Sequence, residues 1–351
     1  MTETRRNRVH VIPETEDITR PNACAALRLV NRFTHPTIAD SFKVSLGSTM
    51  PAEAVDLVVL QRLGSVMGSN EAVEDLVWSL KRGGTKLLYD IDDNLLDCHP
   101  DLETEQAIAP HRRNVRLLLR EADHVTVSTP LLRDRLQRLN SNITVVPNAL
   151  DERRLTADGM VVRADDAFRI GYFGTLTHLR DLMSILGSLR AALFSLPRPP
   201  TLVICGVSQE TRILSTFDGV ANVEVFPTTG DYESFLDSMF SEVRWDIGLA
   251  PLVNGTFEMA KSDIKFLEYA AFGVPGVYAD HPAYTTVRNG ITGLIASPDA
   301  WAASITELAA SPEMRARIVE ASRHYLFSTR TLATANEGLA TVIDQLLKAP
   351  S

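Results

Sequence analysis

The segment 254–275 contains one expected helix with well-defined ends. Its sequence is NGTFEMAKSDIKFLEYAAFGVP. Ser262 is expected to cap the helix, and Gly273 followed by Pro275 is expected to end it after about ten residues.

Two lysines and a glutamate lie at the start of this helix. Lys265 and Glu268 are three residues apart and share a face, and Lys261 lies just before the same end. Free backbone N–H groups, the positive end of the helix dipole and two ammonium groups together suit a phosphate. Glu268 could accept hydrogen bonds from the two hydroxyls of a ribose. The combination therefore predicts a nucleotide site.

A plainer interpretation is a solvated helix face, on which a lysine–glutamate pair is worth a few tenths of a kcal/mol. Lysines in the first turn oppose the helix dipole, however, and lower stability unless an anion is bound. This consideration favours the site.

A second group of charged residues follows an expected strand, in the sequence YDIDD. If a substrate hydroxyl attacks at this strand end, Asp92 or Asp93 could orient that hydroxyl or take its proton. Two alternatives remain open. The carboxylates could cap the next turn, or Asp90 and Asp92 could form the centre of a metal-dependent phosphatase or transferase.

A third candidate pair is His178 with Asp181, which are three residues apart at the start of an expected helix and so meet on one face. His178 could contact phosphate or sugar. Alternatively, Asp181 only complements the positive end of the helix.

The elements that must position these residues alternate between strands and helices. Alternation of this kind predicts an α/β fold with mostly parallel sheets covered on both faces. The expected strands are residues 8–13, 43–46, 56–61, 86–91, 124–128, 143–146, 168–174, 201–205, 222–226, 246–249, 274–278 and 293–296. The expected helices are residues 71–81, 111–121, 178–196, 232–240 and 263–272, one that opens at 311, and one at the C-terminus.

The alternation of strands and helices stops in the charged stretch 150–167 and then starts again, which predicts two domains. We expect domains at residues 1–163 and 164–328, followed by a C-terminal helix at 329–351. Two such domains would leave a cleft at the carboxyl ends of both sheets, where ligands of α/β folds bind.

The helix motif KSDIKFLEYAAFGVP resembles the nucleotide-sugar motif of GT-B glycosyltransferases, particularly the retaining family 4 and a divergent subgroup of it with a K-S-x-x-K-x-x-E pattern. Residues 169–181, RIGYFGTLTHLRD, are similar to the opening of that family's C-terminal domain, and residues 284–294 are similar to its Asn-Gly-x-x-Gly-Leu turn. The resemblance covers roughly residues 168–300, and for the first domain it depends mainly on YDIDD.

The resemblance implies two Rossmann-like domains that face each other across a cleft, with a C-terminal helix that crosses back to the first. The first domain would bind the acceptor and the second the nucleotide sugar. Glu268 would bind the ribose. The diphosphate would be held by Lys261, Lys265 and the turn at Gly174 and Thr175, with Ser262 and His178 beside it.

The resemblance also implies the chemistry. Lys265 would stabilise the leaving diphosphate, while Asp92 or Asp93 would serve the acceptor. Such enzymes need neither metal nor cofactor, because cationic side chains and helix dipoles neutralise the diphosphate. The sequence departs from family 4 where Ala260 replaces the first glutamate of a Glu-x7-Glu pair, Thr175 replaces an arginine and Asp181 replaces a lysine.

We therefore expect a hexosyl- or deoxyhexosyltransferase that moves a sugar from a nucleoside diphosphate donor to a hydroxyl of a polysaccharide, another glycan, or a lipid- or protein-linked acceptor. Two alternatives come from other classes: a non-catalytic module that binds nucleotide sugars, and the metal-dependent enzyme centred on Asp90 and Asp92.

Composition limits the partners and the compartment. The 351 residues include 35 Lys and Arg against 44 Asp and Glu, a net charge of −9, which argues against a nucleic-acid partner. Cys24, Cys98 and Cys205 have neither disulfide-framework nor zinc-ligand spacing, so a reducing cytoplasm fits best. Peripheral contact with the inner face of a membrane stays open, and the sequence does not fix the oligomeric state.

Overall fold

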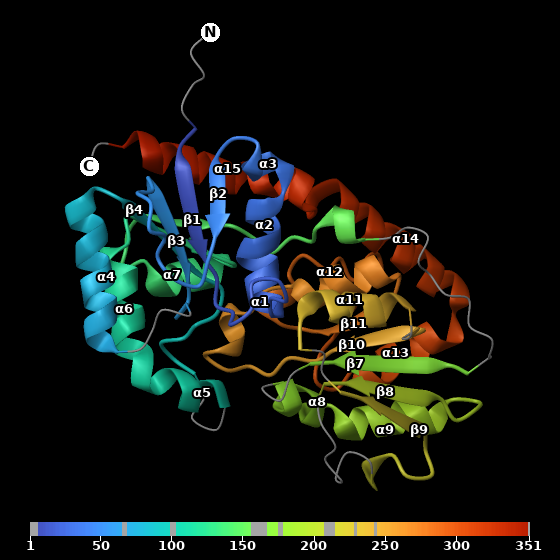
Figure 1. The fold of residues 1–351 in the computed structure, drawn as a ribbon. Coiled ribbons are helices and arrows are strands. Elements are labelled where there is room, and N and C mark those ends of the chain that lie inside the picture. Colours follow the sequence, from blue (N-terminus) through green and yellow to red (C-terminus); the bar gives the residue numbers. More distant parts are fainter. Residues whose placement is uncertain are drawn as a thin grey trace. The chain divides into compact units, whose positions relative to one another are not determined.

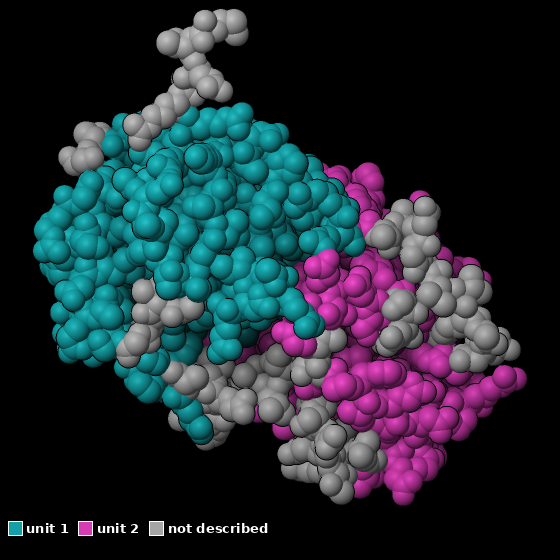
Figure 2. Space-filling model, viewed as in Figure 1, with its two compact units in different colours: residues 1–154, 260–262, 330–351 teal, residues 155–259, 263–329 magenta. Residues whose placement is uncertain are grey.

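The computed structural model contains two six-stranded parallel sheets, each in its own compact unit. It describes residues 6–64, 69–98, 103–155, 167–174, 178–206, 215–227, 230–241 and 244–349. The first unit comprises residues 1–154, 260–262 and 330–351, and the second comprises residues 155–259 and 263–329 (Figure 2). Each unit has the strand–helix alternation that the sequence predicts.

The first sheet has the strand order β2-β1-β3-β4-β5-β6 (Figure 1). Its strands are β1 (Arg8–Ile12), β2 (Lys43–Leu46), β3 (Leu57–Gln61), β4 (Lys86–Ile91), β5 (His124–Val127) and β6 (Ile143–Val145). The chain moves from β1 to one side to form β2, and then to the other side of β1 to form β3. The carboxyl ends of β1 and β3 therefore lie at a topological switch point, which is where open α/β sheets bind ligands.

Two helical layers cover the first sheet. Buried residues of α4 (Asn70–Gly83), α6 (Arg112–Glu121) and α7 (Pro130–Leu136) form one core with the sheet, and Leu76, Leu118 and Leu132 belong to it. Phe33 of α2 (Asn31–Thr34), Ile38 of α3 (Pro36–Ala39) and Ile343 of α15 (Leu332–Lys348) belong to a second core. The C-terminal helix α15 thus packs on the first unit, as predicted.

The first unit also contains short elements. They are α1 (Ala23–Ala25), the π-helical turn η1 (Ala26–Val30), α5 (Glu103–Ile108), and the 3-10 turns η2 (Ala109–His111) and η3 (Glu152–Arg154). The helical stretch from α1 to α3 and the helices α5 and α7 were not among the predicted elements.

The second sheet has the strand order β12-β11-β10-β7-β8-β9. Its strands are β7 (Arg169–Phe173), β8 (Thr201–Cys205), β9 (Asn222–Phe226), β10 (Ile247–Ala250), β11 (Gly276–Ala279) and β12 (Leu294–Ala296). Its switch point lies between β7 and β10, where Gly171 pairs with Gly248. The twelve predicted strands are all present, with ends within two residues of the prediction.

The glycine pair at the centre of this sheet lets aromatic rings lie directly on the strands. A Cβ atom added to Gly171 would lie 1.7 Å from the ring of Trp245, and one added to Gly248 would lie 2.8 Å from the ring of Tyr269. Because Tyr269 belongs to a helix packed on the sheet, the glycines allow that helix to approach the switch point closely.

Helices cover both faces of the second sheet (Figure 1). They are α8 (Leu179–Ser184), α9 (Leu186–Ser195), α11 (Tyr232–Ser241), α12 (Ile264–Phe272), α13 (Trp301–Ala310) and α14 (Pro312–Thr329). The 3-10 turns are η5 (Glu258–Ala260) and η6 (Pro282–Tyr284). Helix α13 was not predicted. None of the helices in the described ranges has the length and hydropathy that crossing a bilayer requires.

The prediction of a single helix over residues 178–196 is wrong. The chain forms α8 and α9 with a break at Ile185. The Ser184 hydroxyl donates to the carbonyl of Asp181 at 2.6 Å, and the Ile185 N–H bonds to the carbonyl of Leu182 instead. A side-chain hydroxyl that competes for a backbone carbonyl commonly interrupts helical hydrogen bonding.

Candidate functional site

Helix α12 begins one residue later than predicted. Its N-cap residue is Asp263, which makes no side-chain capping bond, so the assignment of that role to Ser262 is wrong. The Ser262 hydroxyl instead accepts a hydrogen bond from the Asn148 amide at 2.8 Å. Gly273 ends the helix in the left-handed conformation (φ 66°), as predicted.

Both charged residues of α12 are buried. Lys265 is 7% exposed and Glu268 is 4% exposed. The interpretation of this pair as a solvated helix face is therefore wrong. Charged side chains are almost never buried to this degree without a specific partner.

The ammonium of Lys265 lies over two aromatic rings. Its Nζ atom is 5.0 Å from the ring centroid of Tyr172 and 5.3 Å from that of Phe173, distances at which cation–π attraction operates. Both rings belong to the carboxyl end of β7. Lys265 is thus held at the switch point of the second sheet.

His178 and Asp181 are in contact, as their spacing predicts. His178 Nδ1 lies 2.8 Å from one carboxylate oxygen of Asp181, and the Val253 N–H donates to the other oxygen at 3.0 Å. Burial acts to raise the pKa of Asp181, but His178, the Val253 N–H and the charge of Lys265 outweigh it, and the pKa is lowered. Asp181 is therefore ionised at neutral pH.

Gly174 lies against His178, since a Cβ atom added there would be 2.9 Å from the Cβ of His178. The Tyr172 hydroxyl donates to the His178 carbonyl at 2.9 Å. The structure thus brings Gly174, His178 and Lys265 to the same strand end around Tyr172. Thr175, predicted to bind phosphate with them, lies outside the described residues.

Glu268 has one hydrogen-bond partner in the described ranges. The Tyr232 hydroxyl donates to its Oε1 atom at 3.0 Å. Burial raises the pKa of Glu268 to about 7, although the Tyr232 hydrogen bond and the charge of Lys265 lower it. Sequence analysis missed Tyr232, whose only sequence signal is its place at the start of an expected helix.

Polar residues also gather at the carboxyl edge of the first sheet, in what we call the first-sheet edge cluster: Glu14, Arg62, Asp92, Asp93 and Lys261. The Arg62 guanidinium donates to Asp92 at 2.6 Å, to Asp93 at 2.7 Å and to Glu14 at 3.2 Å. Glu14 follows β1 and Arg62 follows β3, so the cluster spans the switch point of this sheet.

Arg62 has a backbone conformation that side chains rarely adopt. Its φ is 44°, and no other non-glycine residue of the described ranges has a positive φ. Backbone strain of this kind, on the order of 1–3 kcal/mol, is common at functional sites. Sequence analysis missed both Arg62 and Glu14, although each directly follows an expected strand.

Lys261 belongs to the first unit and contacts its acidic residues. Its Nζ atom lies 3.3 Å from Asp93. Burial is the largest single influence and lowers the pKa of Lys261, but the acidic groups around the ammonium, with Asp93 first and Asp92 after it, together outweigh burial, and the pKa is raised. Ala260, which stands where family 4 has a glutamate, is fully buried, and its carbonyl accepts a hydrogen bond from Thr129.

Asp90 is engaged by an arginine rather than open to a metal. Its two carboxylate oxygens accept from Arg28 at 3.1 and 2.6 Å, and the Thr126 hydroxyl donates to it at 2.8 Å. A bidentate guanidinium of this kind is a strong and specific partner for a carboxylate. The hypothesis of a metal site centred on Asp90 and Asp92 therefore has no support from this geometry.

Another group in the first unit has the residue types of a metal site, namely His35, Asp151 and Glu152. Arg153, however, donates to both carboxylate oxygens of Asp151, at 2.8 and 2.6 Å. The two ring nitrogens of His35 lie 2.8 Å from the Thr37 hydroxyl and 2.9 Å from Glu152. These contacts make the group a structural network.

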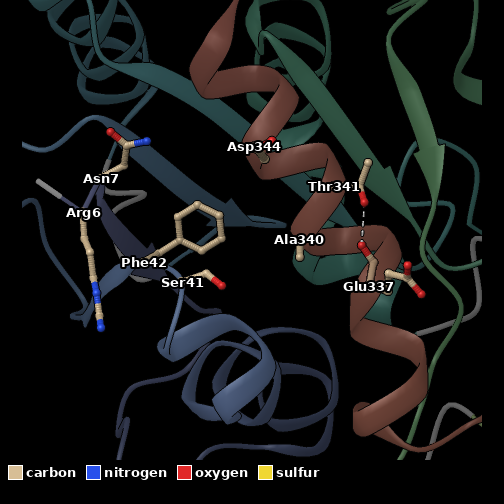
Figure 3. Close-up of a pocket in the computed structure, with 8 residues that line it drawn as sticks. All are labelled: Arg6, Asn7, Ser41, Phe42, Glu337, Ala340, Thr341 and Asp344. Carbon is tan, nitrogen blue, oxygen red and sulfur yellow. Dashed lines mark hydrogen bonds between the residues drawn. The ribbon is translucent and has the colours of Figure 1, made fainter. Parts of the chain in front are cut away.

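A surface hollow of about 450 Å³ lies at the opposite, amino edge of the first sheet, beside α15 (Figure 3). Its walls come from the residues that precede β1 and β2 and from one side of α15. The lining residues are Arg6, Asn7, Ser41, Phe42, Glu337, Ala340, Thr341 and Asp344. None of the predicted site residues lines this hollow.

Comparisons with known proteins support the fold. The sequence matches no protein-family model and no curated protein sequence. Three solved structures are similar along their full length. Sucrose-phosphate synthase from Thermosynechococcus elongatus has a TM-score of 0.69 and 15% identity, with 98% of this chain and 100% of that chain covered.

The protein HepE of Anabaena, crystallised with UDP and glucose, has a TM-score of 0.66 and 12% identity, with 97% and 100% of the two chains covered. A glycosyltransferase from Rickettsia africae has a TM-score of 0.64 and 12% identity, with 99% and 100% covered. Identities this low show the fold alone. The chain has the GT-B fold of nucleotide-sugar glycosyltransferases, as the sequence predicts.

Proposed function

We propose that this protein is a glycosyltransferase that moves a hexosyl or deoxyhexosyl group from a nucleoside diphosphate sugar to a hydroxyl of a glycan, a polysaccharide, or a lipid- or protein-linked acceptor. The proposal rests on one observation above all: Lys265 and Glu268 are both buried beside the switch point of the second sheet. A buried cation and a carboxylate that reaches a ligand suit the two polar parts of a nucleotide, its diphosphate and its ribose.

The similar structures support the choice of donor. HepE was crystallised with UDP and glucose, and this chain covers the full length of HepE and of sucrose-phosphate synthase. We propose UDP-glucose as the first donor to test.

In the proposed reaction Lys265 stabilises the diphosphate as the glycosidic bond breaks. Gly174 and His178 contact the same phosphates. For Ser262 and Lys261, which belong to the first unit, a phosphate-binding role stays a prediction that the motif resemblance implies. Cationic side chains would take the role of a metal ion here. Removal of one preorganised group of this type lowers a reaction rate by on the order of a hundredfold or more.

The fate of the acceptor proton depends on the stereochemical outcome. In the retaining reaction that the motif resemblance implies, the departing phosphate oxygen accepts the proton as the acceptor oxygen bonds to the anomeric carbon. In an inverting reaction Asp92 or Asp93 would be the base. Arg62 fixes the carboxylates of Asp92 and Asp93 at the sheet edge, and a fixed carboxylate there could orient the acceptor hydroxyl or take its proton.

We also propose peripheral contact with an anionic membrane surface. Residues 112–138 contain seven arginines and three acidic residues, whereas the whole chain has a net charge of −9. Arg113, Arg116 and Arg120 are exposed on α6. Basic helix faces of this kind are attracted to anionic lipids.

A thermal-shift screen tests the donor site, because a ligand that binds only the folded state raises the melting temperature. We expect UDP, GDP, dTDP or ADP to raise it, and Lys265→Ala and Glu268→Ala to abolish the shift. The exposed Lys348→Ala is the matched control and should keep it. A full shift in the Lys265 variant would contradict the proposed site.

Diphosphate release separates a transferase from a non-catalytic module. We expect the wild type to release nucleoside diphosphate from the nucleotide sugar that it binds when acceptor glycans are added. The rate of this release should be lower in Lys265→Ala by on the order of a hundredfold. Nucleotide binding without release across a broad acceptor panel would instead favour the module.

A further inference from the structure

Tyr232 is fixed in place at the start of α11. The residue is buried, and its ring stacks on that of Phe235 with centroids 5.9 Å apart. Asp231 stabilises the same helix end, because its carboxylate accepts from the Ser234 N–H at 2.8 Å and from the Ser234 hydroxyl at 2.9 Å. The Tyr232 hydroxyl therefore has little freedom, and it points at Glu268.

The carboxylate of Glu268 is only half satisfied. Its Oε1 atom accepts from Tyr232 at 3.0 Å, while Oε2 accepts no hydrogen bond from any residue in the described ranges. Glu268 is 96% buried, and a carboxylate in such a place normally has both oxygens hydrogen-bonded. An oxygen left open in this way indicates a ligand that donates hydrogen bonds.

We infer that Tyr232 is a positioning residue of the donor site: its hydroxyl holds Oε1 of Glu268 so that the carboxylate can accept hydrogen bonds from the vicinal hydroxyls of a ribose. This inference rests on the proposed function and deepens it. Each carboxylate oxygen has two lone pairs, so Oε1 can serve Tyr232 and one ribose hydroxyl together while Oε2 accepts the other.

Burial gives this arrangement a dependence on pH. The pKa of Glu268 is raised to about 7, and the ionised carboxylate accepts hydrogen bonds from both hydroxyls more strongly than the protonated form does. The titratable groups that act on Glu268 within the described ranges are Lys265, whose charge lowers its pKa, and Tyr232, Tyr269 and Tyr284, which are neutral at this pH. Nucleotide affinity should therefore increase as pH rises through about 7.

Removal of the Tyr232 hydroxyl should shift this pH dependence. The hydroxyl donates to the charged form of Glu268 and so stabilises it, and Tyr232→Phe should therefore move the pH midpoint of binding upward. A hydrogen bond to a charged group contributes about 1.5–3 kcal/mol, which corresponds to a loss of UDP affinity of about 10- to 100-fold at pH 7. At pH 9 the loss should be smaller, because Glu268 is then largely ionised in both proteins.

The experiment measures Kd by calorimetry between pH 6 and 9 for UDP and for its 2′,3′-dideoxy analogue. The proteins are the wild type, Tyr232→Phe and the control Tyr269→Phe, which loses a buried hydroxyl bonded to the Leu249 carbonyl. We expect Tyr232→Phe to weaken UDP binding and to leave the dideoxy analogue unaffected. Tyr269→Phe should keep the wild-type pH midpoint.

The possible failures are distinct. If the wild type binds UDP and Tyr232→Phe binds it with the same affinity and pH midpoint, the inference is overturned. Equal weakening for UDP and the dideoxy analogue would also overturn it, since Tyr232 would then not act through the ribose. The wild type alone tests the pH argument. Ionisation of the terminal phosphate affects both ligands alike, so the ratio of the affinity for UDP to the affinity for the dideoxy analogue should rise through pH 7. Failure of the wild type to bind any nucleotide would instead refute the proposed function.

Discussion

Individual residues of the candidate sites divide into those visible in the sequence and those that folding brings in. The contact between His178 and Asp181 was predicted because it is local, with the two residues on one helical turn. Tyr232 and Arg62 were missed because each meets its carboxylate partners across 30 or more positions of the chain. Such contacts depend on strand order, which a single sequence does not specify.

At the same scale, burial of Glu268 makes the folded state sensitive to pH. The pKa of Glu268 is about 7 in the folded protein, against an ordinary value of 4.5. Between these values the folded state binds more protons than the unfolded state does, so the free energy of unfolding falls as pH rises from 4.5 to 7. The loss of stability that the ionised, buried Glu268 causes is absent below pH 4.5 and complete above pH 7.

We therefore predict that Glu268→Gln stabilises the ligand-free protein more at high pH than at low pH. Relative to the wild type, its free energy of unfolding should rise by about 2–3 kcal/mol more at pH 8.5 than at pH 5, since one pKa unit corresponds to about 1.4 kcal/mol. Chemical unfolding at both pH values measures this difference. A stability gap that is the same at the two pH values would refute the burial argument.

At the scale of elements, strands were easier to predict than helices. Most strands are short, largely apolar runs between turn residues, and such runs can be recognised in the sequence without knowledge of the fold. The stretch from α1 to α2 was missed because two charged residues, Arg28 and Arg32, lie on its buried side and interrupt the apolar pattern. Both are almost fully buried, and they donate hydrogen bonds to Asp90 and Asn336, respectively. Helix α13 could have been found from Trp301, Ile305 and Leu308, which fall at helical spacing.

The central strand β7 allows a direct test of the packing at the switch point of the second sheet. Gly171→Ala places a Cβ atom inside the Trp245 ring, so we expect a loss of stability of about 2–3 kcal/mol or more. Gly187→Ala in α9 is the control, because a Cβ atom there meets nothing within 4 Å and should stabilise the helix by about 0.5–1 kcal/mol. Melting temperatures that move in the same direction for both variants would contradict this account of the packing.

At the scale of the whole molecule, the charge is unevenly distributed. Helices α4 and α6 are linked by ion pairs between Arg113 and Glu74 and between Lys81 and Glu121, while Arg116 and Arg120 remain exposed. Trp78, on α4, is 50% exposed. An exposed indole beside basic residues is a common feature of surfaces that contact lipid headgroups.

We predict that the protein sediments with anionic vesicles containing phosphatidylglycerol and not with neutral phosphatidylcholine vesicles. The triple variant Arg113→Glu, Arg116→Glu, Arg120→Glu should lose about 3 kcal/mol of this binding, and added salt should weaken binding by the wild type. Equal binding of the wild type and the variant would contradict a role for α6 in membrane contact.

The GT-B fold was predictable from the alternation of elements and one helix motif, whereas the donor site was predictable only in part. Its central claim is that α12 binds a nucleoside diphosphate through Lys265 and Glu268. A crystal structure with UDP tests this most directly. We predict that the ribose hydroxyls lie within about 3 Å of Glu268 and a phosphate oxygen lies near Lys265. A nucleotide bound elsewhere, with both side chains still covered, would contradict the account.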